Sequence, residues 1–258
     1  SFIMSLYWHT CGEGKTDLVL LHGWGLNAEV WQPVTEQLSA HFRLHLVDLP
    51  GYGRSQGFPA QTLDQMVTTL LPHIPEDSLI AGWSLGGLVA TRLAGLPGTP
   101  VRGLVTVASS PCFTEQENWP GIKPSVLEGF RQQLSNHFEK TIDRFMALQT
   151  LGTETARQDT RLLREAILSQ PLPDPAVLNT GLGILQATDL RGELPLLKVP
   201  CLRIYGALDG LVPRAIADKV DQLAGQGKSV VIAKAGHAPF ISHPDEFCHE
   251  VINFLLFC

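Results

Sequence analysis

The chain has 258 residues, of which 44% are hydrophobic and 17% are charged. This length suits one domain, or one domain with an insert, and the composition is that of a globular protein and not of a disordered one. The net charge of −6 gives the molecule as a whole no electrostatic reason to bind nucleic acid or an anionic membrane. Five scattered cysteines without a paired spacing argue against a disulfide framework or a zinc site and favour a reducing cytoplasm.

Targeting and cofactor signals are not found in the sequence. The first residues, Ser1 to Thr10, lack the basic segment and long apolar run of a secretory signal peptide. The longest nearly apolar stretch, Leu79 to Ala90, is too short to span a bilayer. These two observations predict a soluble protein. Because no metal-ligand spacing and no glycine-rich nucleotide loop occurs, we also predict that the protein uses no metal or other cofactor.

Short apolar runs alternate with helical patterns through most of the chain. The expected buried strands lie at 18–21, 44–47, 79–81, 104–107, 202–205 and 230–232. The helices expected beside them lie at 30–40, 62–71, 85–95, 213–224 and 244–256. Repeated strand–helix alternation predicts an α/β fold with a mostly parallel central sheet and helices on both faces.

The alternation stops once, in the middle of the chain. Between Cys112 and Thr188 no apolar strand run occurs, and glycine and proline turns separate four helical patterns instead. These patterns lie at 124–137, 139–150, 154–168 and 174–187. We therefore expect a helical lid at 112–188, inserted between a first part of the core at 1–111 and a second part at 189–258.

The sharpest motif is Gly82-Trp83-Ser84-Leu85-Gly86-Gly87, between an expected strand and an expected helix. A nucleophile on a strained strand-to-helix turn needs small neighbours, and this is the context in which a G-x-S-x-G motif is meaningful. The start of the following helix favours negative charge that develops beside Ser84. The sequence therefore predicts Ser84 as a nucleophile.

An acid and a histidine are expected to follow such a serine in that order. Asp209 comes just after the strand at 202–205, and His237 just after the last strand, so both should lie at the same sheet edge as Ser84. We expect His237 to act as general base and Asp209 to fix the imidazole tautomer. Alternative acids and bases occupy positions better suited to turns, helix starts or loop support: Asp48, Asp189, His243 and His22.

Two backbone N–H groups should stabilise the oxyanion of an acyl-transfer reaction. We expect one from Leu85, which follows the nucleophile, and the other from Trp24 in the loop His22-Gly23-Trp24-Gly25. Apolar side chains that could line an acyl pocket, with plain core packing as the alternative for most, are Trp24, Trp83, Phe145 and Leu211, together with Met146 and Phe113.

These motifs and the run Asp48–Ser55 resemble the α/β-hydrolase superfamily over the whole chain. Relatives of this fold that use aspartate as nucleophile differ at Ser84. Within the superfamily, further runs are similar to the pimeloyl-acyl carrier protein methyl ester carboxylesterases of biotin synthesis. These runs lie at 25–31, 108–113, 119–124, 147–150, 152–159 and 237–244.

The resemblance implies hydrolysis of the methyl ester of pimeloyl-acyl carrier protein, with release of methanol. It also implies a monomeric, cytoplasmic protein with loose activity on short-chain esters. Alternatives are a general short-chain carboxylesterase without a carrier partner, an enzyme that cleaves thioesters or C–C bonds with the same triad, and a ligand receptor that retains a slow triad.

Basic residues in the expected lid suit an acidic carrier protein with a phosphopantetheine group. Arg157, Arg161 and Arg164 fall within about 60° of one another on a helix with about 100° per residue, and Lys140 and Arg144 form an i, i+4 pair. A solvated helix face is the alternative, since residues 131–165 contain six basic and five acidic residues. With the resemblance, we favour carrier-protein docking on this surface.

Overall fold

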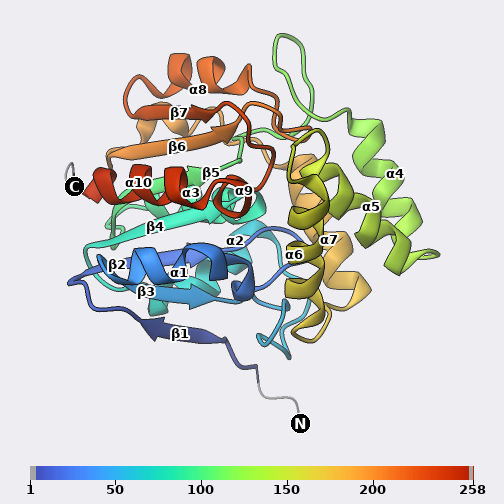
Figure 1. The fold of residues 1–258 in the computed structure, drawn as a ribbon, viewed down its shortest axis with the longest axis horizontal. Helices are drawn as coiled ribbons and strands as arrows, with labels where there is room; N and C mark the ends of the chain where they lie inside the picture. The colour runs from blue at the N-terminus through green and yellow to red at the C-terminus, as the bar shows by residue number, and fades with distance from the viewer. Residues whose placement is uncertain (1–3, 256–257) are drawn as a thin grey trace.

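The computed structural model describes residues 4–255 and 258, in which seven strands form one sheet (Figure 1). The strand order is β1-β3-β2-β4-β5-β6-β7, and every neighbouring pair is parallel except β1 with β3. This arrangement confirms the expected mostly parallel sheet. The strands are β1 (Trp8–Cys11), β2 (Thr16–Leu21), β3 (Phe42–Val47), β4 (Ser78–Trp83), β5 (Val101–Val107), β6 (Cys201–Gly206) and β7 (Lys228–Ile232).

Helices cover both faces of the sheet, as expected. In the view of Figure 1, α1 and α10 contact each other in front of the sheet, and α2 and α3 contact each other behind it. The helix expected from residue 30 starts as a 3₁₀ turn at Ala28–Trp31, and Pro33 lies in the first turn of α1, where its missing N–H is tolerated. The core helices are α1 (Gln32–Ser39), α2 (Leu63–Leu70), α3 (Leu85–Ala94), α8 (Ile216–Ala224), α9 (Pro239–Ser242) and α10 (Pro244–Leu255). Position 256 of the expected last helix lies outside the described residues.

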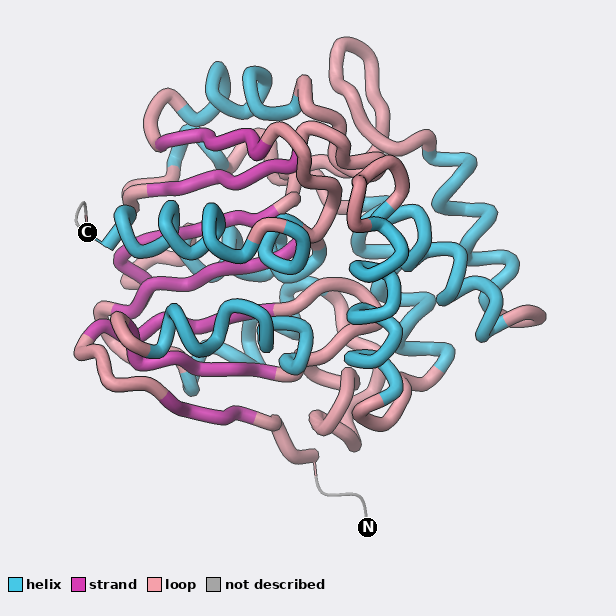
Figure 2. Tube along the Cα trace, viewed as in Figure 1, coloured by secondary structure: helices cyan, strands magenta, loops and turns pink. Residues whose placement is uncertain are grey.

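Four helices between β5 and β6 lie beside the carboxyl ends of the strands (Figure 2). They are α4 (Pro124–Leu134), α5 (Phe138–Thr150), α6 (Ala156–Leu168) and α7 (Pro175–Ala187). Helix α5 packs against α6, and α4 packs against both α5 and α7. A buried hydrogen bond joins this layer to the core: Nδ2 of Asn27 donates to the carbonyl of Ala166 on α6 (2.8 Å). No helix in the described part of the chain is both long and apolar enough to cross a membrane.

Candidate active site

Ser84 lies on the tight turn between β4 and α3, with φ 55° and ψ −115°. Positive φ is costly for a residue with a side chain, so neighbouring groups must hold this conformation. A Cβ on Gly82 would collide with the carbonyl oxygen of Gly86, and a Cβ on Gly86 would lie 2.5 Å from the carbonyl oxygen of His22. The glycines of the motif are therefore required by close backbone approach, and Ser84 itself is 4% exposed.

The loop after β5 supports this turn from the side. The backbone N–H of Ser84 donates to the carbonyl of Val107 (2.9 Å), and the hydroxyl of Ser109 donates to the carbonyl of Ser84 (2.9 Å). A Cβ on Gly87 would collide with the same Ser109 hydroxyl. Sequence reasoning missed Ser109, because no motif distinguishes it from any other serine in a loop.

Asp209 and His237 form a buried hydrogen-bonded pair. Nδ1 of His237 lies 2.8 Å from Oδ2 of Asp209, and the side chains are 0% and 1% exposed. A carboxylate only accepts hydrogen bonds, so the proton of this bond lies on Nδ1. Oδ1 of Asp209 accepts from the backbone N–H groups of Leu211 (2.7 Å) and Val212 (3.0 Å). Both carboxylate oxygens are thus satisfied, and the imidazole tautomer is fixed.

Close backbone contacts bring the two loops together at the carboxyl edge of the sheet. A Cβ on Gly206, the last residue of β6, would collide with the carbonyl oxygen of Gly236. The carbonyl of His237 accepts a hydrogen bond from the Trp83 indole (2.7 Å), whose ring lies 5.7 Å from the imidazole. Nε2 of His237 is buried without a hydrogen-bond partner in the part of the chain that the structure describes. That nitrogen is available to accept a proton.

His22, an alternative base, has both ring nitrogens occupied. Its Nδ1 donates to the carbonyl of Gly23 (2.7 Å), and its Nε2 accepts the backbone N–H of Leu49 (2.9 Å). The side chain is fully buried, and this burial lowers the pKa of His22. The ring therefore stays neutral and supports its loop.

Asp48, Asp189 and His243 are also held by neighbouring side chains. Both oxygens of Asp48 accept hydrogen bonds from Arg54. Asp189 lies 2.8 Å from Arg191, and the His243 ring lies 2.7 Å from the hydroxyl of Ser242. These three residues therefore have side-chain partners other than Asp209 and His237.

The expected oxyanion donors lie on two neighbouring segments, the start of α3 and the loop after β2. Leu85 begins α3, and the loop of Trp24 passes over the same glycine turn, where His22 approaches Gly86. Among residues 4–255 and 258, no hydrogen bond occupies the backbone N–H of Trp24 or of Leu85. Gly25 has φ 79°, a conformation that glycine adopts without strain. Both N–H groups therefore remain available for an oxyanion.

Four of the expected pocket residues, Trp24, Trp83, Phe145 and Leu211, lie on or beside the loops of the candidate site. The Trp24 ring lies 4.7 Å from the Phe145 ring, and its indole N–H donates to the carbonyl of Leu178 on α7 (2.8 Å). Trp83 packs beside His237 and also against Gly23, the residue before Trp24, and the backbone N–H of Leu211 donates to Asp209. All four side chains are buried.

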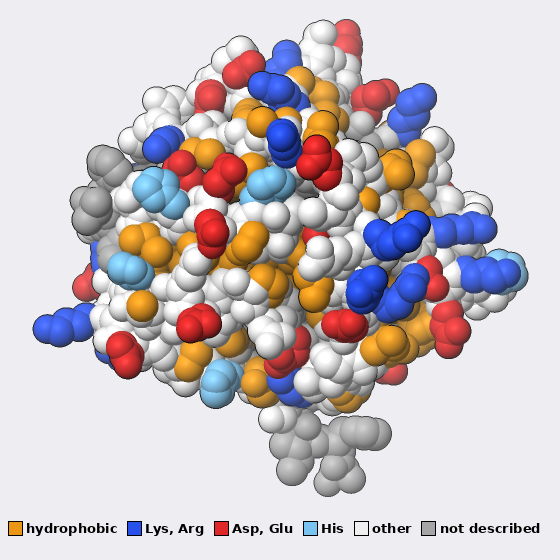
Figure 3. Space-filling model, in the orientation of Figure 1, with side chains coloured by type: hydrophobic (Ala, Val, Ile, Leu, Met, Phe, Trp, Pro, Cys, Tyr) orange, Lys and Arg blue, Asp and Glu red, His pale blue; other side chains and the backbone are white. Residues whose placement is uncertain are grey.

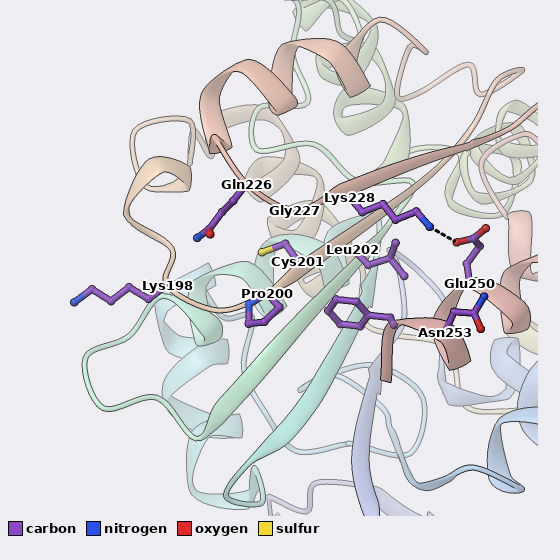
Figure 4. Close-up of a pocket in the computed structure, with 10 residues that line it drawn as sticks. Lys198, Pro200, Cys201, Leu202, Gln226, Gly227, Lys228, Glu250 and Asn253 are labelled. Atoms are coloured by element: carbon purple, nitrogen blue, oxygen red, sulfur yellow. Dashed lines mark ion pairs between the residues drawn. The ribbon is translucent and has the colours of Figure 1, made fainter. Parts of the chain in front are cut away.

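A cavity of about 340 Å³ lies elsewhere, beside the N-terminal ends of β6 and β7 (Figure 4). Its lining includes Lys198, Cys201, Leu202 and the ion pair Lys228–Glu250 (3.5 Å). Because Ser84, Asp209 and His237 follow the carboxyl ends of their strands, this cavity is at the opposite edge of the sheet and does not belong to their site.

The basic residues expected to bind a carrier protein are exposed on α5 and α6, and Figure 3 shows Lys and Arg side chains gathered over this region. Arg157, Arg161 and Arg164 line a groove of about 550 Å³ that also contains the exposed Leu151 and Leu168. Arg164 lies 3.3 Å from Asp143. The two basic residues of α5 are Lys140 and Arg144, and Arg144 donates to Gln133 (2.8 Å).

Comparison with known proteins places the chain in a family. Residues 17–244 match the family model described as alpha/beta hydrolase fold. The chain is 60% identical over 250 residues to the pimeloyl-acyl-carrier-protein methyl ester esterase of Pectobacterium carotovorum, covering 97% of this chain and 98% of that protein. It is 59% identical over 250 residues to the protein of the same name from Edwardsiella ictaluri, covering 97% of each.

Solved structures agree on the fold. An esterase from Exiguobacterium antarcticum superposes with a TM-score of 0.84 at 20% identity, over 96% of this chain and 94% of that one. An enol-lactonase from Burkholderia xenovorans superposes with a TM-score of 0.84 at 21% identity, over 97% and 96% of the two chains. The chain belongs to the α/β-hydrolase fold family and, within it, to the family of the pimeloyl-acyl-carrier-protein methyl ester esterases.

Proposed function

We propose that the protein hydrolyses the methyl ester of pimeloyl-acyl carrier protein to pimeloyl-acyl carrier protein and methanol, as in biotin synthesis. Ser84, His237 and Asp209 are its triad. The observation that carries the triad is the buried Asp209–His237 hydrogen bond, which leaves Nε2 as the free imidazole nitrogen. The substrate rests on 60% identity to esterases of that name across nearly the whole chain, including the helices between β5 and β6.

In this mechanism Oγ of Ser84 attacks the ester carbonyl while Nε2 of His237 takes its proton. The backbone N–H groups of Trp24 and Leu85 stabilise the negative oxygen of the tetrahedral intermediate. Collapse of the intermediate expels methanol, which receives the proton from His237, and leaves the pimeloyl group, still attached to its carrier protein, bound to Ser84 as an ester. Water then attacks this ester with His237 as base, and a free carboxylate and the Ser84 hydroxyl result.

The segment 112–188 acts in this proposal as a lid that carries the docking surface. Arg157, Arg161 and Arg164, with Lys140 and Arg144, attract the acidic carrier protein, and exposed Leu151 and Leu168 add apolar contact in the groove. The charge reversal below separates this function from that of a general short-chain carboxylesterase, which would need no basic surface.

Changing both Arg157 and Arg161 to glutamate should lower kcat/KM for the carrier-bound ester by about tenfold or more. Exposed ion pairs contribute up to about 1 kcal/mol each, and reversal turns two attractions into repulsions. Turnover of free dimethyl pimelate should change by less than about twofold, because neither arginine lies among the triad or oxyanion residues. Steady-state kinetics on both esters measure the difference.

The matched control is Lys15→Glu, an exposed basic residue just before β2 at the opposite edge of the sheet. It changes the net charge in the same direction by half as much, so it reports any effect of overall charge on encounter with an acidic partner. Two results would contradict carrier-protein docking and show that the arginines belong to a solvated helix face. One is an equal loss on both esters in the arginine variant, and the other is an equally large loss on the carrier-bound ester in Lys15→Glu.

A further inference from the structure

The last turns of α5, residues 145–149, contact the loop expected to supply the oxyanion N–H. The Phe145 ring lies 4.7 Å from the ring of Trp24. The terminal methyl of Met146 lies 3.7 Å from the position that a Cβ on Gly25 would occupy. Both side chains are buried, at 2% exposure, so these contacts are part of the packed interior. The α5 end (residues 145–149) therefore packs directly against one half of the site.

The same α5 end also holds the loop that carries His237. The carbonyl of Gln149 accepts the backbone N–H of His237 (3.0 Å), and it is one of the last helix carbonyls, which have no partner within the helix. On the other side of the residue, the carbonyl of His237 is held by the Trp83 indole. The methyl of Thr153, just beyond α5, lies 3.0 Å from the position of a Cβ on Gly236. Both backbone polar groups of His237 are thus fixed, one of them by α5.

We propose that the α5 end is the positioning element of the active site, which sets the place of His237 relative to the oxyanion loop. This inference rests on the proposed role of His237 as base. It gives the helices between β5 and β6 a part in the chemical step, in addition to covering the site. Displacement of reacting groups by about 1 Å can cost about 10²-fold in rate, so a small shift of this helix should be visible in kcat.

The test introduces a methyl group between the His237 loop and α5. Gly236 does not have positive φ, so Gly236→Ala keeps an allowed backbone, but its Cβ meets the Thr153 methyl at 3.0 Å and the Gln149 carbonyl at 3.3 Å. We expect kcat on dimethyl pimelate to fall about tenfold or more, with a smaller change in KM. Titration of Ser84 with a fluorophosphonate gives kcat per competent molecule, and thermal unfolding reports the fold.

The rescue removes the methyl on the other side. Thr153→Ser lacks Cγ2 and keeps the hydroxyl that donates to the Thr150 carbonyl (3.0 Å). The double variant should therefore recover to within about threefold of Thr153→Ser alone, since the displacement is relieved. Gly210→Ala, whose Cβ would meet the Leu148 carbonyl at an ordinary 3.6 Å, should lose far less than Gly236→Ala.

The outcomes distinguish a failure of the positioning role of α5 from a failure of the proposed role of His237 as general base. Wild-type kcat in Gly236→Ala, or a double variant as slow as Gly236→Ala, overturns the positioning role of α5 even where His237→Ala is inactive. Full turnover by a folded His237→Ala variant overturns the proposed base, and the positioning role with it. Recovery in the double variant, with a matching thermal midpoint, supports the proposal.

Discussion

Ser84→Ala is expected to reduce ester turnover by about 10⁶-fold, the loss found when the nucleophile of a comparable triad is removed. The substitution deletes the hydroxyl that would form the acyl-enzyme. It leaves the backbone hydrogen bonds of Ser84 to Val107 and Ser109 in place, so the turn should persist. Methanol release from the carrier-bound ester measures the rate, and thermal unfolding checks that the variant is folded.

A suitable control is Ser39→Ala at the end of α1, where the hydroxyl donates to the local carbonyl of Glu36 and to no other group in the described part of the chain. This variant should turn over at the wild-type rate. A folded Ser84→Ala protein that keeps even about a hundredth of wild-type turnover would show that another group is the nucleophile.

Asp209→Asn should lower kcat by about 10⁴-fold with little loss of structure. The amide oxygen can still accept from Leu211 and Val212, which leaves the NH₂ group facing Nδ1 of His237. Since NH₂ only donates, Nδ1 must then accept, and the ring proton moves to Nε2. Nε2 can no longer take the proton of Ser84. Pre-steady-state acylation with a chromogenic ester measures the step directly.

Asp189→Asn is the matched substitution at an exposed carboxylate, where the partner is Arg191 and not a histidine. We expect kcat within about twofold of wild type, because exposed ion pairs contribute little. An Asp209→Asn variant with a similarly small loss would contradict the assignment of Asp209 as the orienting acid.

The sequence predicted those elements whose residue pattern is strong. Six strands appear as apolar runs, and all six are found, although β7 is only partly buried. The edge strand β1 was not expected, because His9 and Thr10 are exposed and Trp8 and Cys11 only half-buried, so no apolar run marks it. Its position depends partly on tertiary bonds, such as that from the Trp8 indole to His45 (2.9 Å), which no local pattern shows.

In the candidate site, too, the residues with a clear sequence pattern were predicted and those without one were not. Ser84, Asp209 and His237 were identified because each follows a strand, and parallel strands bring their carboxyl ends to one edge. The Gln149 carbonyl could not be found from sequence, since a backbone group has no residue signature and its partner lies 88 positions away in the chain. Contacts between the helices of 112–188 and the loops of the core are therefore what the structure adds.

The most direct measurement of the central claim is methanol release from pimeloyl-carrier-protein methyl ester and from free dimethyl pimelate, each at low and high salt. We expect a strong preference for the carrier-bound ester that weakens as salt screens the basic surface. Equal or better use of the free ester at both salt concentrations would contradict the carrier-protein assignment. The chain would then be a general carboxylesterase with the same triad.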